Sequence, residues 1–225
     1  MKLVKIGKTM VAGLCIAATL AGAALPTMAL SPAGYTSLAQ IEEMNDDEEA
    51  QVQALKAAIA KVNVKYDKVE QSWQFDSPIY DKAEKNKSCC LAPWIFIFEG
   101  REDVYFDEDF FYNGSSHIDL NKVYVRAGDN LYTYECDPDY TDYAYDKDKK
   151  VWWALSNFQM EPSEIDWLRE MLGAKTIITR YSGASGVRYD YTWTADDRQA
   201  VTDMVNLYDL LVAASPEVRA RALRG

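Results

Sequence analysis

Residues 121–136 read NKVYVRAGDNLYTYEC, and this stretch decides the fold class. Two runs rich in Val, Tyr and Thr flank the turn-forming sequence Ala127-Gly128-Asp129-Asn130, a pattern typical of a β-hairpin. Strands joined by so short a turn must be antiparallel, because a parallel crossover needs a dozen or more residues. The stretch therefore predicts an antiparallel sheet.

Other strand-like segments lie on both sides of this hairpin. A second hairpin is predicted in residues 175–193, around the turn Ser182-Gly183-Ala184-Ser185-Gly186. Single runs of strand length have the sequences VNVKY (62–66), PWIFIFEG (93–100), DVYFDEDFFYNG (103–114) and VWWALSNF (151–158). We expect DVYFDEDFFYNG to form one or two short strands that close in an Asn113-Gly114 turn.

Three segments carry helical periodicity. In residues 45–62, Asn45 or Asp46 caps a stripe of Val52, Leu55, Ile59 and Val62. Residues 161–173 begin near Pro162 and stop at Gly173, and a third helix is capped by Thr194 and ends at Ser215-Pro216. The predicted class is α+β: a mostly antiparallel sheet of about six to eight strands, with an N-terminal, a short middle and a C-terminal helix packed on one face.

The first 29 residues predict a secretory signal peptide. Three lysines precede an apolar run that is too short to span a membrane, and small residues surround the helix-breaking Pro26. The alternative is an uncleaved membrane anchor. We expect residues 30–44 to be a spacer, 45–214 a single α+β domain and 215–225 a basic C-terminal tail. The predicted location is extracytoplasmic, either secreted or in the periplasm or cell envelope, with no membrane span after cleavage.

The charge of the chain limits its partners. The formal net charge is -11, and removal of three lysines with the signal peptide makes it -14. Such a surface repels phosphate backbones and anionic lipid, so nucleic acid is not an expected partner. Cations, basic proteins and neutral glycans remain as ligand classes, and solubility alone also explains the charge.

Cysteine usage follows from the predicted compartment. Cys15 lies in the signal peptide, which leaves Cys89, Cys90 and Cys136. Cys90 precedes one predicted strand and Cys136 follows another, so we expect a disulfide from Cys136 to Cys90, or to Cys89, if those strands are antiparallel neighbours. The remaining thiol is either an incidental free cysteine or an interchain link between two copies. A ring joining Cys89 to Cys90 is the strained alternative.

The candidate binding site is residues 137–150, DPDYTDYAYDKDKK, which are too polar for a core strand and predict a projecting loop. Tyrosines among acids offer rigid contact area with polar tips, which suits an interface. The candidate residues are Asp137, Asp139, Tyr140, Asp142, Tyr143 and Tyr145. No cofactor is expected; calcium is the one metal that the aspartates suit, although the Gly and Glu of a helix–loop–helix calcium site are missing.

Catalytic motifs are not evident. SGASG lacks the final Gly of a nucleophile elbow, because Val187 follows it, and His117 is the single histidine. We therefore favour a non-catalytic binding or interaction module that uses an acidic, tyrosine-rich surface and binds a protein or glycan. The alternative is an extracytoplasmic hydrolase with an unidentified pair of carboxylates.

Overall fold

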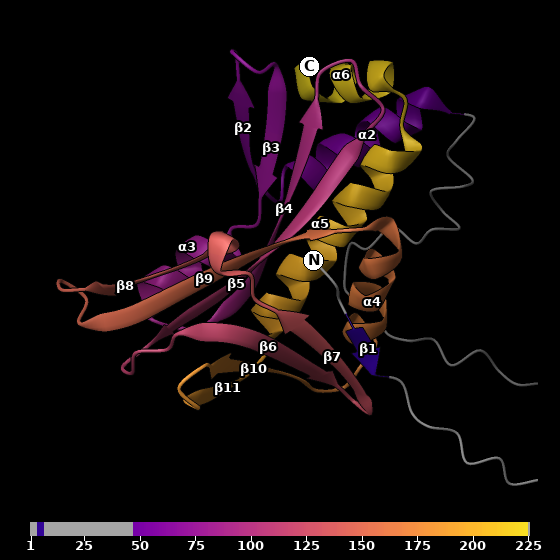
Figure 1. Ribbon diagram of the computed structural model, residues 1–225. Helices are drawn as coiled ribbons and strands as arrows, with labels where there is room; N and C mark the ends of the chain where they lie inside the picture. Colours follow the sequence, from indigo (N-terminus) through magenta and orange to yellow (C-terminus); the bar gives the residue numbers. More distant parts are fainter. Residues whose placement is uncertain (1–3, 7–46, 225) are drawn as a thin grey trace, which may run out of the picture.

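The computed structural model describes residues 4–6 and 47–224 and confirms the α+β class with antiparallel sheets. The chain forms two sheets where the sequence suggested one (Figure 1). The predicted signal peptide, except for residues 4–6, and the predicted spacer lie outside the described residues, as do Asn45 and Asp46. No helix in the described part of the chain is long and apolar enough to cross a membrane.

The larger sheet has six strands in the order β2-β3-β4-β5-β9-β8. Its strands are β2 (Asn63–Asp67), β3 (Ser72–Asp76), β4 (Cys90–Phe98), β5 (Val104–Gly114), β9 (Val151–Met160) and β8 (Thr141–Asp146). The predicted turn at Asn113-Gly114 does not divide β5, which runs as one long strand and pairs with both β4 and β9.

The second sheet has the order β1-β7-β6-β10-β11. The predicted hairpins appear here as β6 (Leu120–Ala127) with β7 (Asn130–Glu135), and β10 (Ile177–Gly183) with β11 (Arg188–Thr192). The short β1 (Val4–Ile6) pairs with the edge of β7, and it lies inside the segment predicted to be cleaved. The remaining four strands belong to the predicted mature chain.

Five helices complete the described fold: α2 (Glu48–Ile59), α3 (Ile79–Asn86), α4 (Pro162–Leu172), α5 (Ala195–Ala213) and α6 (Pro216–Arg224). Local sequence explains their starts. Asp47 caps α2 through its side chain, in place of the expected Asn45 or Asp46, and Thr194 and Asp197 form a capping box at α5 as the sequence indicated for Thr194. α5 packs across β4 and β5, and α2 packs on α5 and α6. The sequence did not predict α3, and the expected basic tail forms α6.

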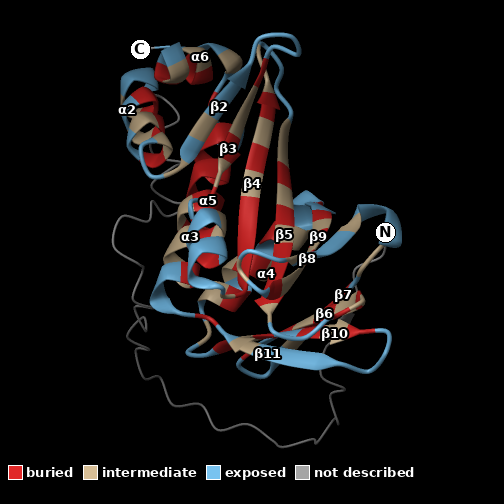
Figure 2. Ribbon diagram, turned by 90° about the vertical axis from the view of Figure 1, so that its left-hand side faces the viewer, coloured by how far each residue is buried: buried red, intermediate tan, exposed pale blue. Residues whose placement is uncertain are grey.

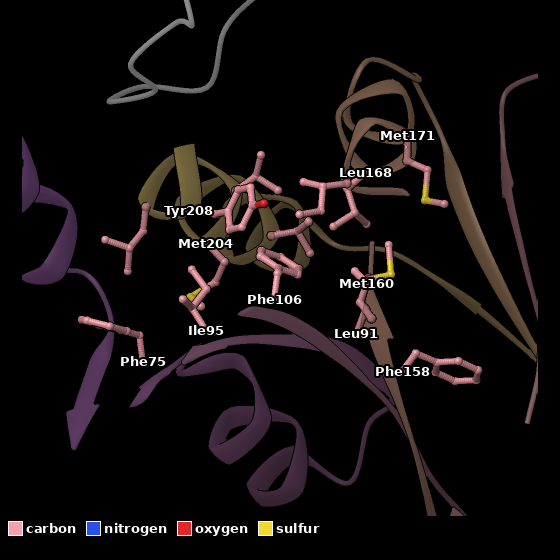
Figure 3. Close-up of a cluster of buried hydrophobic side chains, with 14 of the residues drawn as sticks. Phe75, Leu91, Ile95, Phe106, Phe158, Met160, Leu168, Met171, Met204 and Tyr208 are labelled. Carbon is pink, nitrogen blue, oxygen red and sulfur yellow. The ribbon is translucent and has the colours of Figure 1, made fainter. Parts of the chain in front are cut away.

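The main core lies between α5, α4 and the inner faces of both sheets. Figure 3 shows Met204 and Tyr208 of α5 above Ile95 and Phe106, with Leu168 of α4 beside them. At the other end of the core the two sheets meet, and Phe110 packs edge-on against Tyr134. The outer face of each sheet stays outside this core. On the six-stranded sheet α3 covers one end of that face, where Ile79 and Ala83 pack on Cys90, Ala92 and Phe111 in a second, smaller cluster.

The prediction that residues 137–150 form a projecting loop is wrong. A short 3-10 helix, η1 (Pro138–Tyr140), leads into β8, which pairs with β9 along its whole length. The β8–β9 hairpin extends beyond the other strands in Figure 1. Asp-rich sequence can form this strand because β8 is an edge strand with almost no buried residue, so its side chains meet water on both faces.

Candidate binding site

The outer face of the six-stranded sheet gathers acids around a tryptophan. Strand register places Asp76 of β3, Trp94 of β4 and Asp107 of β5 side by side. Asp109, two residues further along β5, lies opposite Asn157 of β9. These five residues point to the same face because alternate side chains of a strand do so.

The alternation of β5 explains this arrangement. Phe106, Glu108 and Phe110 are fully buried on the inner face, whereas Asp107 and Asp109 are half-buried on the outer one. In Figure 2 the upper parts of β4 and β5 are seen without a described helix in front of them. The residues between the core positions can therefore be polar.

A hollow of about 560 Å³ lies over this face. We call it the acidic hollow; Asn63, Lys65, Asp76, Ser77, Tyr80, Asp81, Ala92, Pro93, Trp94, Asp109 and Leu155 line it, and Asp107 adjoins it beside Trp94. α3 supplies Tyr80 and Asp81, so the helix that the sequence did not predict forms one wall. Strands β2 to β5 and β9 supply the rest, apart from Ser77, which lies between β3 and α3.

The carboxyl groups in this region carry shifted pKa values. Burial, and then the Asp109 carboxylate, raises the pKa of Asp107 to about 6, while Asn157 acts in the opposite direction. The Oδ1 atom of Asp107 is buried and has no hydrogen-bond partner among the described residues. Burial also raises the pKa of Asp109, against hydrogen bonds from Asn157 (2.9 Å) and Trp94 that lower it. Negative charge here is thus incompletely compensated.

One cation is present in the hollow and it is already paired. Lys65 Nζ lies 2.7 Å from Asp76 Oδ2, and this contact raises the pKa of Lys65. Asp81, Asp107 and Asp109 form no ion pair with a described residue. A positively charged group placed over Trp94 would meet a ring face and two carboxylates, which is a favourable environment for an ammonium or guanidinium.

The predicted site residues lie elsewhere, on η1 and β8. Tyr140, Tyr143 and Tyr145 are 62%, 55% and 44% exposed. Tyr143 and Tyr145 share one face of β8, and the rings of His117 and Trp152 pack against them. The ring centroid of His117 lies 5.6 Å from that of Tyr143 and 4.6 Å from that of Trp152. The structure therefore brings two of the three tyrosines into one aromatic cluster and leaves Tyr140 apart from it.

The predicted aspartates do not converge. Asp137 caps η1 and accepts a hydrogen bond from the Asp139 backbone N–H, and Asp142 lies on the opposite face of β8 from Tyr143. Within the described residues, no group of three or more His, Cys, Asp or Glu side chains is placed to hold a metal ion.

The expected disulfide is not formed: Cys89, Cys90 and Cys136 are free thiols. The reason for expecting it is wrong, because Cys90 begins β4 in the six-stranded sheet and Cys136 follows β7 in the other sheet. Burial raises the pKa of the Cys89 thiol to about 12 and that of Cys136 to about 11. Such thiols are poor nucleophiles near neutral pH. Cys15 lies outside the described residues.

Sequence reasoning missed Asp76, Trp94, Asp107, Asp109 and Asn157 as a group. They come from four strands, and only strand pairing brings them together. The one local signal was the alternation in DVYFDEDFF, which places Asp107 and Asp109 on a single face.

Fold and site together define an α+β protein with a half-covered antiparallel sheet and an acidic, aromatic hollow on its outer face. The chain matches no known family model, and no curated protein or solved structure shows significant similarity to it.

Proposed function

We propose that this protein is a non-catalytic extracytoplasmic binding module that holds a basic ligand, such as a Lys- or Arg-bearing peptide segment of a partner protein, in the acidic hollow. The observation that supports this most directly is the placement of Trp94 between Asp76 and Asp107, with Asp109 hydrogen-bonded to its indole. The site differs from the Tyr-rich surface expected from the sequence, while the class of function is the same.

Electrostatics favours a cationic ligand over a neutral one. Burial disfavours the ionised forms of Asp107 and Asp109, so a nearby positive charge gains interaction energy with both. The ring of Trp94 adds a cation–π contribution, roughly 0.5–2 kcal/mol depending on how far the site excludes water. The hollow is wide enough for an extended side chain with its backbone.

The test is binding of a tetralysine peptide, measured by calorimetry at low, constant ionic strength. The double variant Asp107→Asn/Asp109→Asn should bind at least about tenfold more weakly, because two partly desolvated charges are lost. Trp94→Ala should also weaken binding. The matched control, which we call the hairpin variant, is Asp139→Asn/Asp148→Asn; it removes the same charge from η1 and the β8–β9 turn and should change affinity less than about twofold.

Three results would overturn the proposal. Equal losses in both double variants would show that only net charge attracts the peptide. Weaker binding in the hairpin variant alone, or in Tyr143→Ser/Tyr145→Ser, would place the binding site on the tyrosine-rich surface that the sequence predicted. A wild-type protein that does not bind the peptide would exclude a basic ligand of this kind.

A hydrolase is the second candidate, and the raised pKa values of Asp107 and Asp109 are the observation that favours it. Residues two apart on a strand are about 6.8 Å apart at Cα, and inverting glycosidases separate their carboxyl groups by roughly 6.5–9.5 Å. An oligosaccharide screen with product detection by mass spectrometry separates the two functions. Turnover that Asp109→Asn abolishes while binding persists would make the protein an enzyme.

A further inference from the structure

The outer face of the five-stranded sheet carries the opposite charge. Arg126 on β6, Arg180 on β10 and Arg188 on β11 are all exposed there. Figure 1 shows this sheet at the bottom of the molecule, with the other sheet above it. Three arginines on one face stand out in a chain with 35 acids and 24 Lys and Arg.

Strand register sets the arginines in a diagonal row. Arg180 pairs with Tyr124 on one side and with Asp190 on the other, Arg126 pairs with Ile178, and Arg188 pairs with Ser182. All three line one hollow of about 380 Å³, which we call the basic hollow; its other lining residues are Tyr124, Leu131, Ile178 and Asp190. Guanidinium groups therefore surround a floor that is mainly apolar and aromatic.

Only one of these cations is neutralised. Arg180 donates from Nε and Nη2 to the two carboxylate oxygens of Asp190, at 2.5 and 2.6 Å, and this contact lowers the pKa of Asp190. Neither Arg126 nor Arg188 forms an ion pair with a described residue. The basic hollow thus has three positive charges and one negative charge, and Asp190, which would repel an anion, is already held by Arg180.

Such an arrangement is costly without a ligand. Like charges close together on a sheet face destabilise it, and nothing in the core requires arginine at exposed positions 126 and 188. An anion with about two negative charges would neutralise the excess. A phosphate group carries about -1.5 to -2 at neutral pH and offers several acceptor oxygens, whereas a carboxylate carries -1 and is satisfied by a single guanidinium fork.

We propose that the basic hollow is a subsite for the phosphate group of a soluble organic phosphate. Arg126 and Arg188 reach the phosphate oxygens from the two ends of the row, and Arg180, fixed by Asp190, lies between their backbone positions. The organic part of the ligand packs on Tyr124, Leu131 and Ile178. This site lies on the other sheet from the acidic hollow and does not depend on the function proposed for that hollow.

The test uses inorganic phosphate and glycerol 1-phosphate as probes, with calorimetry at constant ionic strength and chloride as the background anion. The double variant Arg126→Ala/Arg188→Ala should bind both probes at least about tenfold more weakly, and glycerol 1-phosphate should bind more tightly than phosphate. Arg188→Lys keeps the charge but loses the fork, so it should weaken binding by a smaller factor.

The matched control is Lys68→Ala/Lys85→Ala, which removes two exposed cations from the β2–β3 turn and α3. It should bind the probes as the wild type does. An equal loss in this control would reduce the effect to net charge and overturn the proposal, as would a wild type that binds neither probe. Binding confined to phosphatidylglycerol vesicles would assign the face to a membrane surface and would also overturn it.

Discussion

Glu108 is a carboxylic acid enclosed in the core. It is fully buried on the inner face of β5, and neither carboxyl oxygen has a hydrogen-bond partner of ordinary geometry among the described residues. Burial, and then the Glu164 carboxylate, raises the pKa of Glu108 to about 8, while the neighbouring Tyr134 hydroxyl lowers it. The side chain is therefore mostly neutral near pH 7.

This shift makes stability depend on pH. In the unfolded chain Glu108 loses its proton near its ordinary pKa of 4.5, whereas the folded protein retains the proton up to about pH 8. The contribution of Glu108 to the free energy of unfolding is therefore fully present below about pH 4.5 and is lost as the pH rises toward 8.

Glu108→Gln should remove this dependence, because the amide has nearly the same shape and never ionises. We expect a melting temperature close to that of the wild type at about pH 4.5 and several degrees higher at about pH 8.5. Scanning calorimetry across this range measures the difference, with the exposed Glu70→Gln as control. Parallel curves for Glu108→Gln and wild type would mean that Glu108 is not neutral in the fold.

The sequence shows Asp107, Glu108 and Asp109 in a row but not their separate roles. Alternation along a strand predicts that the middle acid faces away from its neighbours. Which face is the core depends on β4 and β9, which pair with β5 from elsewhere in the chain. For this reason the sequence predicted an acidic protein with carboxylate pairs but could not say which acids form a site.

Among the elements, α6 has a structural role that its composition hides. Arg219 is buried, and its guanidinium donates to backbone carbonyls of Leu211 in α5 and of Arg101 and Glu102 in the β4–β5 turn. The donor–acceptor distances of these hydrogen bonds are 2.7 to 3.0 Å. The side chain thus ties the end of the chain to α5 and to the six-stranded sheet.

Arg219→Ala should destabilise the protein by roughly 2–4 kcal/mol, because three backbone carbonyls, that of Leu211 buried and those of Arg101 and Glu102 partly buried, lose a charged donor. Arg221 in the same helix is the control: it pairs with Glu48 and Glu49 at the exposed surface, and Arg221→Ala should cost less than about 1 kcal/mol. Urea denaturation measures both. Equal effects would contradict a structural role for the buried arginine.

Elements with strong local signals were predicted, and those that depend on neighbours were not. Caps and periodicity identified α2, α4 and α5, and turn residues identified the hairpins of the second sheet. α3 buries only Ile79 and Ala83, too few for a periodic pattern, and β8 forms a strand because β9 pairs with it. Turn lengths showed that strands are antiparallel but not that β6 leaves the sheet of β5, the strand that precedes it.

At the scale of the whole molecule, acidic and basic residues that are interspersed along the sequence gather on different sheets in the fold. The net charge of -11 predicted an acidic surface, and the acidic hollow lies on the six-stranded sheet. The arginines of the basic hollow come from three strands of the other sheet, so no local run of basic residues revealed them. A mean charge excludes anionic partners only when charge is evenly spread, and here it is not.

The proposed basic ligand should bind in a pH-dependent way set by Asp107. With a pKa of about 6, Asp107 is ionised at pH 7.5 and largely neutral at pH 5. A cation gains less from a neutral carboxyl, so tetralysine affinity should fall by about five- to tenfold between these values. Asp107→Asn should bind weakly at pH 7.5 and like the wild type at pH 5. Wild-type affinity that does not change over this range would show that Asp107 is not part of the binding site.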